Sequence, residues 1–437
     1  MDLDLIIGIG GLVLLLVLLA LRVPIAFSLG IVSLGGVAVL RGGLPAISAL
    51  ETLTFNFIAH WSLSAVPMFL LMGNIAYKSG LTQSLYRAAR MWLSGLPGGL
   101  AIASTAACAM FAAASGSSVA TASAMGRIAI PEMMKYKYDP GLATGTVAAA
   151  GTLGSLIPPS ILIILFAIFT EASIGQMLIA GILPGILSGL VFAAMIMIRC
   201  KINPKLAPKV EGGVTLTEKI QVLREVWPLP VLIVGVLGGI YSGFFTPTEA
   251  GAGGAFLAFI IAATQKRLNW TVFKESVIET CSATAMIFLI AMGGIMLTRF
   301  MAVSGVPAAL SSALGPYGLD PVILVIAASV IYIFLGMFLD SLGLMLLTLP
   351  VLLPLFEASG ADIIWFGILV IKYLEIGLIT PPVGLNVYII KGVVGDSIPL
   401  ETIFKGVLWF IVADIFTLTL LIIFPQISLY LPSLMQF

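Results

Sequence analysis

The chain has 437 residues, of which 60% are hydrophobic and only 9% carry a charge. Soluble domains carry about 25% charged residues, so the composition excludes a soluble globular protein, and a net charge of +1 argues against a nucleic-acid partner. A single histidine and three cysteines argue against zinc and haem sites.

Long apolar runs follow one another along nearly the whole chain. A bilayer core about 30 Å thick requires roughly 20 apolar residues in each crossing helix. The first run follows Asp2 and Asp4 and not a basic segment, so we interpret it as a membrane helix and not as a signal peptide. Membrane helices are expected at 3–21, 23–41, 62–78, 141–171, 174–199, 228–244, 249–265, 279–300, 363–392 and 404–432.

Two further apolar regions, 98–131 and 320–357, are interrupted near their middles. The interruptions are Ser-Gly-Ser-Ser at 115–118 and Asp-Ser-Leu-Gly at 340–343. Each arm has about 15 residues, which is short for a complete crossing. We therefore expect two re-entrant hairpins, each with a polar tip.

The positions of Lys and Arg predict the orientation. With the N-terminus outside, all of the 21 Lys and Arg residues except Arg41, Arg299 and Lys372 fall on or near the inner side, as the positive-inside rule requires. The C-terminus is then also outside, and the charged stretch 200–227 is inside. The second hairpin enters from the side opposite to the first.

The two halves of the chain match each other weakly but in the same order. Four matches are separated by 220 to 225 residues, and the hairpin orientations make the repeat inverted. Inverted repeats with broken helices are typical of secondary transporters. The matched segments are 72–75 and 292–295, 79–81 and 304–306, 115–118 and 340–343, and 154–159 and 377–382.

Two Pro-Pro pairs lie in the last matched segments. Proline lacks an amide donor and disfavours helix in the preceding residue, so we expect the chain to unwind near 154–159 and 377–382. The freed carbonyls must face protein or a polar cavity. With hydroxyls and the Asp340 carboxylate they form hard oxygen ligands for a small cation, while helix N-termini at the breaks favour an anion.

Each of these sequence features also has a purely structural interpretation. One Pro-Pro pair alone is as often a kink as a site, and Ser-Gly-Ser-Ser is more typical of close helix packing; two symmetric pairs favour function. A carboxylate such as Asp340 between two apolar arms has a high free-energy cost, so a purely structural role explains it less well. Lys372 and Glu375, three residues apart, are expected to pair on one helix face.

The chain carries no H-E-x-x-H, G-x-x-x-x-G-K-[ST] or G-x-S-x-G motif, and we predict that it is not an enzyme. An intramembrane enzyme would need paired catalytic groups, yet the counterpart of Asp340 in the first half is Ser115 or Gly116. A channel would not need inverted hairpins. Energy must come from an ion gradient or from another subunit.

Four stretches carry a family resemblance: 114–121, 151–160, 246–250 (Thr-Pro-Thr-Glu-Ala) and 377–386 (Gly-Leu-Ile-Thr-Pro-Pro-Val-Gly-Leu-Asn). They resemble the large membrane subunit of tripartite ATP-independent periplasmic (TRAP) transporters, the dicarboxylate-transporter M type. The resemblance covers essentially the whole chain, and the second Pro-Pro motif is its most specific part.

This resemblance implies a multi-pass protein of the bacterial inner membrane, with both termini in the periplasm. Its partners would be a small membrane subunit of about four helices, a periplasmic substrate-binding protein, a small organic anion and membrane lipid. Because the chain begins at the first M-type helix, we expect the small subunit to be a separate chain. The amphipathic stretches 45–60 and 80–96 are expected to be arm helices that brace a scaffold.

Site residues are implied as well, at the hairpin tips and the facing breaks. The first expected sodium site comprises Ser115, Gly116, Ser117, Gly151 and Gly154. The second comprises Asp340, Ser341, Gly343, Gly377 and Thr380. The substrate is expected between them, near Ser118, Pro158, Ser160, Asp340, Pro381 and Asn386. No arginine lies at a tip or break, so backbone N–H groups and hydroxyls would hold a carboxylate.

The expected fold is an all-α polytopic membrane protein of the elevator type, an inverted repeat with two re-entrant helical hairpins and two unwound helices. A transport domain would move against a scaffold. The expected divisions are 1–97 (scaffold and arm helix), 98–171 (first hairpin and broken helix), 172–319 (scaffold with the loop 200–227), 320–392 (second hairpin and broken helix) and 393–437 (C-terminal scaffold helix).

The predicted function is sodium-coupled uptake of a small organic acid, such as a C4-dicarboxylate, a 2-oxo acid or a sugar acid, with Na+ as coupling ion and no organic cofactor. The alternative is a stand-alone ion-coupled dicarboxylate or citrate carrier that needs no binding protein. A neighbouring gene for a secreted binding protein would distinguish the two.

Overall fold

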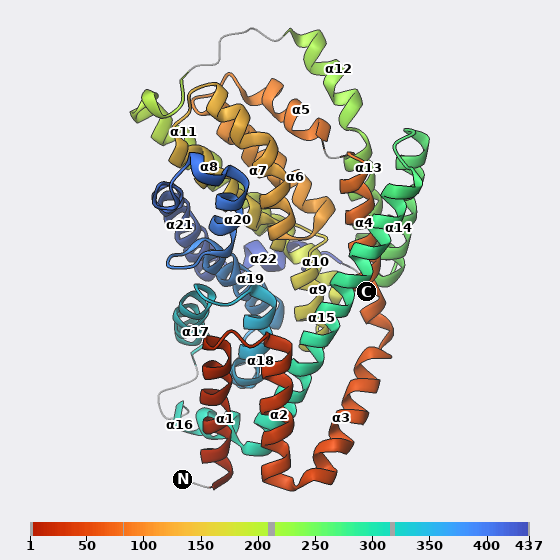
Figure 1. Ribbon diagram of the computed structural model, residues 1–437, viewed down its shortest axis with the longest axis vertical. Helices are drawn as coiled ribbons and strands as arrows, with labels where there is room; N and C mark the ends of the chain where they lie inside the picture. Colours follow the sequence, from red (N-terminus) through yellow and green to blue (C-terminus); the bar gives the residue numbers. More distant parts are fainter. Residues whose placement is uncertain (1–2, 82, 209–214, 315–319, 436–437) are drawn as a thin grey trace.

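The computed structural model describes residues 3–81, 83–208, 215–314 and 320–435, and within these ranges it contains helices and turns but no strand (Figure 1). The expectation of an all-α protein is therefore confirmed. Five helices in the described ranges are long and apolar enough to cross a membrane, or up to seven if each of two helix pairs bent at a short break is counted as one span. The composition and these helices identify a multi-pass membrane protein.

The N-terminal helices form one end of the molecule (Figure 1). They are α1 (Leu3–Ala20), α2 (Ile25–Arg41) and α3 (Gly43–Ile58), followed by the short 3-10 turn Trp61–Ser64 and α4 (Ala65–Lys78). Helices α1 and α2 pack with α15 (Trp270–Ser304) in a separate apolar cluster centred on the buried ring of Phe300. The chain bends by 58° between α3 and α4.

Most of α3 is exposed, and only Ala46 and Phe57 on it are buried. The expected arm segments 45–60 and 80–96 correspond to helices, α3 and α5 (Gln83–Leu93). Their role in bracing a scaffold stays a prediction.

The first hairpin region consists of α6 (Gly99–Ser115) and α7 (Ser118–Lys135), joined by Gly116 and Ser117. Helix α8 (Pro140–Thr152) follows, then a 3-10 turn at Leu153–Ser155, an irregular stretch, and α9 (Ile161–Phe169). The predicted break at 115–118 and the predicted unwinding near 154–159 both coincide with interruptions of helix. Helix α8 is buried along nearly its whole length.

The second hairpin region repeats this order of elements. Helices α17 (Pro321–Gly336) and α18 (Ser341–Ala358) are followed by α19 (Ile363–Ile379), an interruption at 380–384, and α20 (Leu385–Val394). Like α8, α19 is buried over almost all of its length. The opposite orientation of the two hairpins in the membrane stays a prediction.

The arms of both hairpins are longer than the sequence suggested. They have 17 and 18 residues in α6 and α7, and 16 and 18 residues in α17 and α18. The expected length of about 15 residues is one to three residues too short, and α18 is long and apolar enough to cross a membrane. Length alone therefore does not make these arms re-entrant.

Other predicted spans differ in their ends. Helix α15 begins at Trp270 and not at 279, because Asn269 caps it and Lys78 of α4 forms ion pairs with Glu275 (3.3 Å) and Glu279 (2.9 Å). The predicted span 174–199 corresponds to α10 (Ile174–Ala180) and α11 (Ile182–Ile202), which together form one stretch long and apolar enough to cross a membrane. The predicted span 404–432 is divided into α21 (Leu400–Ile423) and α22 (Gln426–Ser433).

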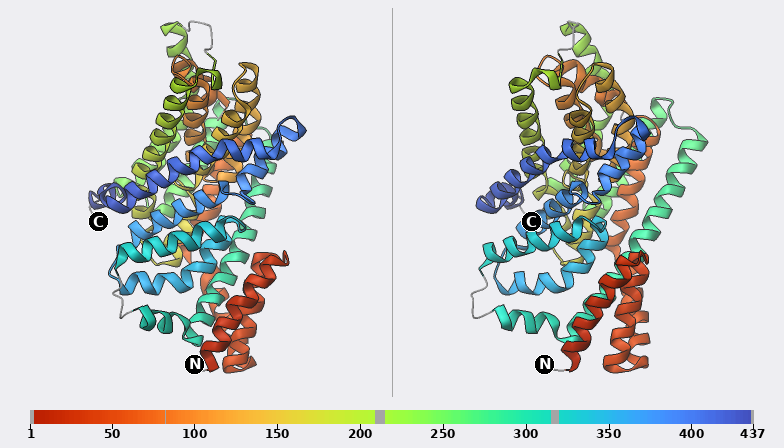
Figure 2. Two further views of the ribbon diagram at one scale, coloured as in Figure 1. Left: turned by 90° about the vertical axis from the view of Figure 1, so that its left-hand side faces the viewer. Right: turned by 60° about the vertical axis from the view of Figure 1, so that its left-hand side comes forward.

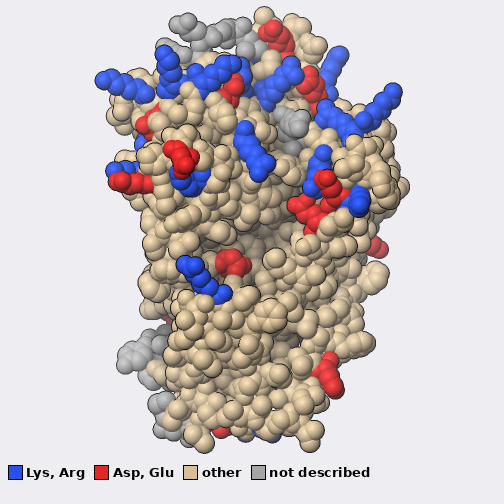
Figure 3. Space-filling model, in the orientation of Figure 1, with Lys and Arg blue, Asp and Glu red and all other residues tan. Residues whose placement is uncertain are grey.

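Helix α21 runs obliquely across the bundle (Figure 2) and packs against both α8 and α19. The remaining helices are α12 (Leu216–Val226), α13 (Pro228–Tyr241), α14 (Pro247–Thr264) and α16 (Val306–Leu314). Lys and Arg gather at the end of the molecule where α5, α11 and α12 lie (Figure 3). This one-sided distribution is what the positive-inside rule anticipates, while the sidedness of the termini stays a prediction.

Candidate functional site

The first hairpin tip is a short turn rich in hydroxyl groups. Gly116 ends α6 in the left-handed conformation (φ 60°), and Ser117 caps α7 by accepting a hydrogen bond from the Ala120 amide at 3.4 Å. The hydroxyls of Ser115 and Thr121 lie 3.0 Å apart, and Thr121 also donates to the Ser117 carbonyl at 2.7 Å. The turn therefore concentrates hard oxygen atoms in one place.

This tip closes directly onto the first break. A methyl group added at Gly116 would lie 2.6 Å from the Pro159 carbonyl oxygen, and one added at Gly154 would lie 2.9 Å from the Ser117 carbonyl oxygen. Distances this short leave no room for any side chain. Glycine at both positions is thus required for the backbone of the tip to touch the backbone of the break.

Three serines connect the tip to the break through hydrogen bonds. The Ser118 hydroxyl lies 2.5 Å from the Ser155 hydroxyl and 3.2 Å from the Thr152 carbonyl. Ser160 caps α9 and donates to the Ser155 carbonyl. Ser118, Ser155 and Ser160 are all buried, so these groups satisfy one another away from solvent.

The second tip has a different polar chemistry. Asp340 caps α18 by accepting a hydrogen bond from the Gly343 amide at 3.1 Å. The hydroxyl of Ser341 is buried and has no hydrogen-bond partner among the described residues. A buried hydroxyl without a partner is costly, so Ser341 is an oxygen available to a ligand.

The second tip approaches its break through α17. A methyl group added at Gly377 would lie 2.8 Å from the Gly336 Cα atom, so the end of α17 contacts the end of α19 backbone to backbone. The Thr380 hydroxyl donates to the Ile376 carbonyl at 2.6 Å within its own helix end. No hydrogen bond in the described part of the chain joins Asp340 to Thr380.

Asn386 connects the two halves. It is fully buried at the start of α20, and its amide donates to the Ala148 carbonyl of α8 at 3.2 Å. Its own carbonyl oxygen has no partner among the described residues. The break that follows α19 therefore lies against the helix that leads into the first break.

The expected sites are assembled to different degrees. For the first set, Ser117 meets Gly154 directly, Gly116 meets the Pro159 carbonyl and Ser115 lies beside Thr121, while Gly151 packs against Ala122 of α7. In the second set, Gly343 lies against Ile25 of α2 and against the carboxylate of Asp340, which caps its helix. Both Pro158–Pro159 and Pro381–Pro382 are cis. Whether these residues bind sodium or substrate stays a prediction.

Three further residues contribute oxygen atoms to the first site and were not predicted from the sequence. Thr121, Thr152 and Ser155 take part in the network, although only their neighbours were named as candidates. All three lie inside the stretches that carried the family resemblance. Helical spacing could have predicted Thr121, because it lies four residues after Ser117 and donates a hydrogen bond to the Ser117 carbonyl.

A large cavity of 1390 Å³ lies apart from the predicted residues. It is bounded by α3, the α9–α10 loop, the α13–α14 loop and α15. Arg299 and His60 line it together with the carboxylates of Glu171 and Glu249. Arg299 makes no ion pair with any described residue. The lining is therefore of mixed charge.

The conspicuous Thr-Pro-Thr-Glu stretch at this cavity has a clear local role. Thr246 and Glu249 form a reciprocal capping box at the start of α14, in which the Glu249 carboxylate accepts from the Thr246 amide at 2.9 Å. This arrangement satisfies amides that a helix start leaves free. The stretch is thus explained by helix capping.

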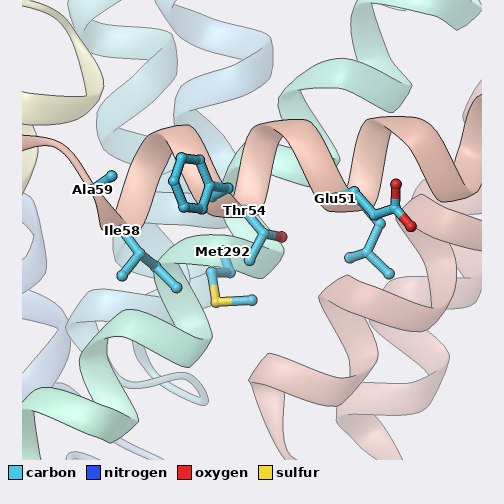
Figure 4. Close-up of a pocket in the computed structure, with 7 residues that line it drawn as sticks. Glu51, Thr54, Ile58, Ala59 and Met292 are labelled. Atoms are coloured by element: carbon cyan, nitrogen blue, oxygen red, sulfur yellow. The ribbon is translucent and has the colours of Figure 1, made fainter.

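A second, shallower hollow of 520 Å³ lies beside α3 (Figure 4). Figure 4 shows Glu51, Thr54 and Ile58 on α3 with Met292 of α15 across the hollow. The lining is apolar apart from Glu51 and Thr54, and no predicted site residue reaches it. It belongs to the exposed N-terminal part of the molecule and not to the broken helices.

The expected pairing of Lys372 with Glu375 is confirmed. The ammonium lies 3.0 Å from the Glu375 carboxylate on the same face of α19, and both side chains are fully buried. A third member, Asp414 of α21, lies 2.6 Å from the same ammonium. Asp414 stands alone in an apolar run, so nothing near it in the sequence marks it as a partner of Lys372.

A family described as "Tripartite ATP-independent periplasmic transporter, DctM component" matches residues 12–427. The C4-dicarboxylate TRAP transporter large permease protein DctM of Pseudomonas aeruginosa is 34% identical over 403 residues, covering 91% of this chain and 92% of that protein. The sialic acid TRAP transporter large permease protein SiaM of Vibrio cholerae is 32% identical, covering 95% of this chain and 96% of the other.

A similar architecture occurs in a solved structure. The YdaH transporter of Alcanivorax borkumensis superposes with a TM-score of 0.64, over 88% of this chain and 89% of that one. Because only 14% of the residues are identical, the likeness concerns the fold alone.

Proposed function

Because the chain belongs to the DctM component family of the tripartite ATP-independent periplasmic transporters, we propose that this large permease subunit takes up a small organic acid together with sodium ions. The substrate class includes C4-dicarboxylates, 2-oxo acids and sugar acids. The relatives matched above are permeases for C4-dicarboxylates and sialic acid. These are anions of different size but with a common carboxylate.

One observation carries the sodium proposal: the first hairpin tip touches the first break through backbone atoms. The contact of Gly116 with the Pro159 carbonyl and of Gly154 with the Ser117 carbonyl brings together oxygens from two separate segments. The hydroxyls of Ser115 and Thr121 lie beside them. Carbonyl and hydroxyl oxygens are the ligands of hard cations, and unwound carbonyls coordinate sodium in transporters with broken helices.

The substrate carboxylate is proposed to bind at helix starts. Helices α7, α9 and α20 all begin at the tip or at the breaks. Their first amides carry partial positive charge and favour an anion. Gly384 at the start of α20 provides no side-chain cap, so the amides there are available to a ligand.

We further propose an elevator cycle with two partners. The hairpins and broken helices would move as a transport domain, and the helices before, between and after them would form the scaffold. A small membrane subunit would pack on the scaffold, and a periplasmic binding protein would deliver the substrate. The N- and C-termini would lie in the periplasm.

Uptake into proteoliposomes tests this proposal. The chain is reconstituted with the proposed small membrane subunit, and radiolabelled succinate, pyruvate and sialic acid are supplied with and without the binding protein. Each condition is run with an inward sodium gradient and with the same concentration of sodium on both sides. Uptake that requires the binding protein and the gradient is expected.

A variant of the first hairpin tip tests the first cation site. Thr121→Val removes one hydroxyl of the first tip at nearly constant volume and is expected to raise the sodium concentration for half-maximal uptake. Thr419→Val, an exposed threonine on α21 that donates to its own helix, is the matched control. Uptake without the binding protein would favour a stand-alone carrier, and uptake indifferent to sodium would overturn the cation sites.

A further inference from the structure

Arg199 carries a positive charge that no described residue balances. It lies in the last turn of α11 and forms no ion pair with any residue that the structure describes. Its Nη1 atom is buried and has no hydrogen-bond partner among those residues. The carboxylate of Asp139, beside the end of α11, is used to cap α8 by accepting from the Leu142 amide at 2.8 Å. An anion from outside these residues would balance the charge of Arg199.

The guanidinium of Arg199 lies over an aromatic ring of a neighbouring helix. Its central carbon is 5.0 Å from the centre of the Trp409 ring on α21. A cation over an indole ring is attracted by the ring's quadrupole. The ring fixes the position of the guanidinium but supplies none of the carboxylate or phosphate oxygens that its fork of N–H donors matches. The pair therefore holds a guanidinium in place with donors to spare.

Apolar side chains exposed to the outside of the protein flank this pair on both helices. Trp409 itself is 51% exposed, and tryptophan is enriched where a membrane meets water. In a multi-pass membrane protein, such faces are in contact with lipid chains. The exposed apolar residues nearest in sequence are Ile198 and Ile202 on α11 and Leu408, Val412 and Phe416 on α21.

The pair also belongs to the basic part of the surface. Helix α11 lies at the end of the molecule where Lys and Arg gather (Figure 3), and the exposed Lys201 follows Arg199 by two residues. Lys405 precedes Trp409 by four residues, which places both on one face of α21. Its only ion pair among the described residues, with Glu401, is exposed and so contributes little. Positive charge and apolar surface therefore meet at Arg199.

We propose that Arg199 and Trp409 form a binding site for the phosphate group of an anionic phospholipid. The guanidinium fork matches two oxygens of a phosphate, and the acyl chains would lie on the exposed apolar side chains of α11 and α21. Basic pockets between membrane helices on the cytoplasmic side bind acidic head groups in this way. A free phosphate ion would use the guanidinium but would leave the flanking apolar faces without a role, so the lipid is favoured.

The position of the site gives the lipid a structural consequence. The end of α11 packs on the start of α6, where a methyl group added at Gly98 would lie 2.7 Å from Ile196 and 2.8 Å from the Sγ atom of Cys200. Helix α21 packs against α8 and α19. A lipid on Arg199 and Trp409 would therefore join two helices that contact both broken-helix regions. This inference does not depend on which substrate or ion is transported.

Quenching of tryptophan fluorescence by brominated lipids tests the proposal. The full chain is purified with and without the proposed small membrane subunit, and brominated phosphatidylglycerol or brominated phosphatidylcholine is titrated into the detergent micelles. We expect stronger quenching by phosphatidylglycerol at equal mole fraction. Trp409→Phe keeps an aromatic ring under Arg199 but removes the reporter, so the excess quenching should disappear in this variant. A wild-type protein without this preference would overturn the proposal, however the variants fold.

Substitutions of Arg199 test the role of its guanidinium. Arg199→Gln should raise the phosphatidylglycerol concentration for half-maximal quenching at least about tenfold, because a charge-assisted hydrogen bond is lost. Arg199→Lys keeps the charge but not the fork and should give an intermediate value. The matched control is Arg87→Gln, which removes one positive charge from the same end of the molecule, where Arg87 already pairs with Glu225 at 3.2 Å. Equal binding by Arg199→Gln and the wild type would contradict the site.

Two further arms identify the occupant. Thermal unfolding is measured in phosphatidylcholine micelles with sodium phosphate or sodium chloride at equal ionic strength, and again with phosphatidylglycerol. We expect phosphatidylglycerol alone to raise the midpoint of the wild type above that of Arg199→Gln. A rise with phosphate and none with phosphatidylglycerol would assign the site to soluble phosphate and overturn the lipid. Excess quenching seen only without the small subunit would mean that this partner covers Trp409, and would also overturn it.

Discussion

The two broken-helix regions have the same order of elements but are held together by different forces. In the first half, α8 is buried and built largely of small residues, and it meets α21 through glycine: a methyl group added at Gly145 would lie 2.6 Å from the Gly406 carbonyl carbon. In the second half, α19 meets the same helix through Lys372, Glu375 and Asp414.

The same arrangement of helices can therefore be stabilised by two different kinds of interaction. Close contact of backbones depends on dispersion and tolerates no added atom. A buried ion cluster tolerates some variation in distance but requires its charges to balance. The hairpin tips differ in the same sense, because the first uses a left-handed glycine with hydroxyls and the second uses the carboxylate cap of Asp340.

The largest expected effect comes from unbalancing the ion cluster. Lys372→Met leaves two buried carboxylates without their ammonium and should destabilise the protein by about 3–5 kcal/mol. Thermal unfolding in detergent, followed by the loss of monodisperse protein, measures this. The control is Lys405→Met, which breaks only the exposed pair with Glu401 and should leave the thermal stability nearly unchanged.

The stability lost in Lys372→Met should be recoverable if the second half depends on charge balance. Combining Lys372→Met with Glu375→Gln and Asp414→Asn replaces the cluster by neutral groups of similar volume, and most of the lost stability should return. A triple variant as unstable as Lys372→Met alone would mean that lysine packing, and not charge, holds α19 to α21. The contrast with the first half would then disappear.

The next effect concerns the first half, where space is the constraint. Gly116→Ala places a methyl group 2.6 Å from the Pro159 carbonyl oxygen, in a left-handed backbone conformation (φ 60°). Gly305→Ala meets the same conformational penalty (φ 72°) but has no atom within 4 Å. Gly116→Ala should therefore be less stable than Gly305→Ala by about 1–3 kcal/mol, the usual cost of overpacking.

Transport should separate the two glycine variants more clearly than stability does. Gly305→Ala lies at the end of α15 and should retain uptake, whereas Gly116→Ala separates the tip from the break and should lose most of it. Equal melting temperatures and equal uptake for the two variants would mean that the tip can move away from Pro159 at little cost.

The interruptions of helix could be predicted from the sequence because their causes are local. Pro158–Pro159 and Pro381–Pro382 remove amide donors where they stand, and Gly116 permits a tight turn where it stands. These effects need no knowledge of the rest of the fold. The first tip and both breaks were accordingly found near the predicted places, whereas the second tip lies at 337–340, before the predicted 340–343, because Asp340 caps α18 and residues 341–343 already belong to that helix.

Features that depend on distant partners could not be predicted in this way. Asp414 is 39 residues after Glu375 in the chain, and nothing near it in the sequence indicates that it meets Lys372. The start of α15 was missed because Lys274, Glu275 and Glu279 lower its apolar character, while the ion pairs with Lys78 that stabilise it are tertiary. The approach of Asn386 to Ala148 likewise requires both halves to be placed.

The smallest expected effect distinguishes a cap from a ligand at the second tip. Asparagine caps helices about as well as aspartate, so Asp340→Asn should leave thermal stability nearly unchanged, whereas Asp340→Ala should cost about 1 kcal/mol. If the Asp340 carboxylate also binds sodium, removing its charge should raise the sodium concentration that gives half-maximal uptake. Uptake measured over a range of sodium concentrations tests this.

Asp320 provides the matched control, because it caps α17 in the same way and is exposed at the start of the same hairpin. Asp320→Asn should change neither stability nor the sodium dependence. An Asp340→Asn protein with the sodium dependence of Asp320→Asn would make Asp340 a cap and nothing more. Cation binding would then be concentrated at the hydroxyl-rich first tip, and the two halves would differ in function as well as in the forces that hold them.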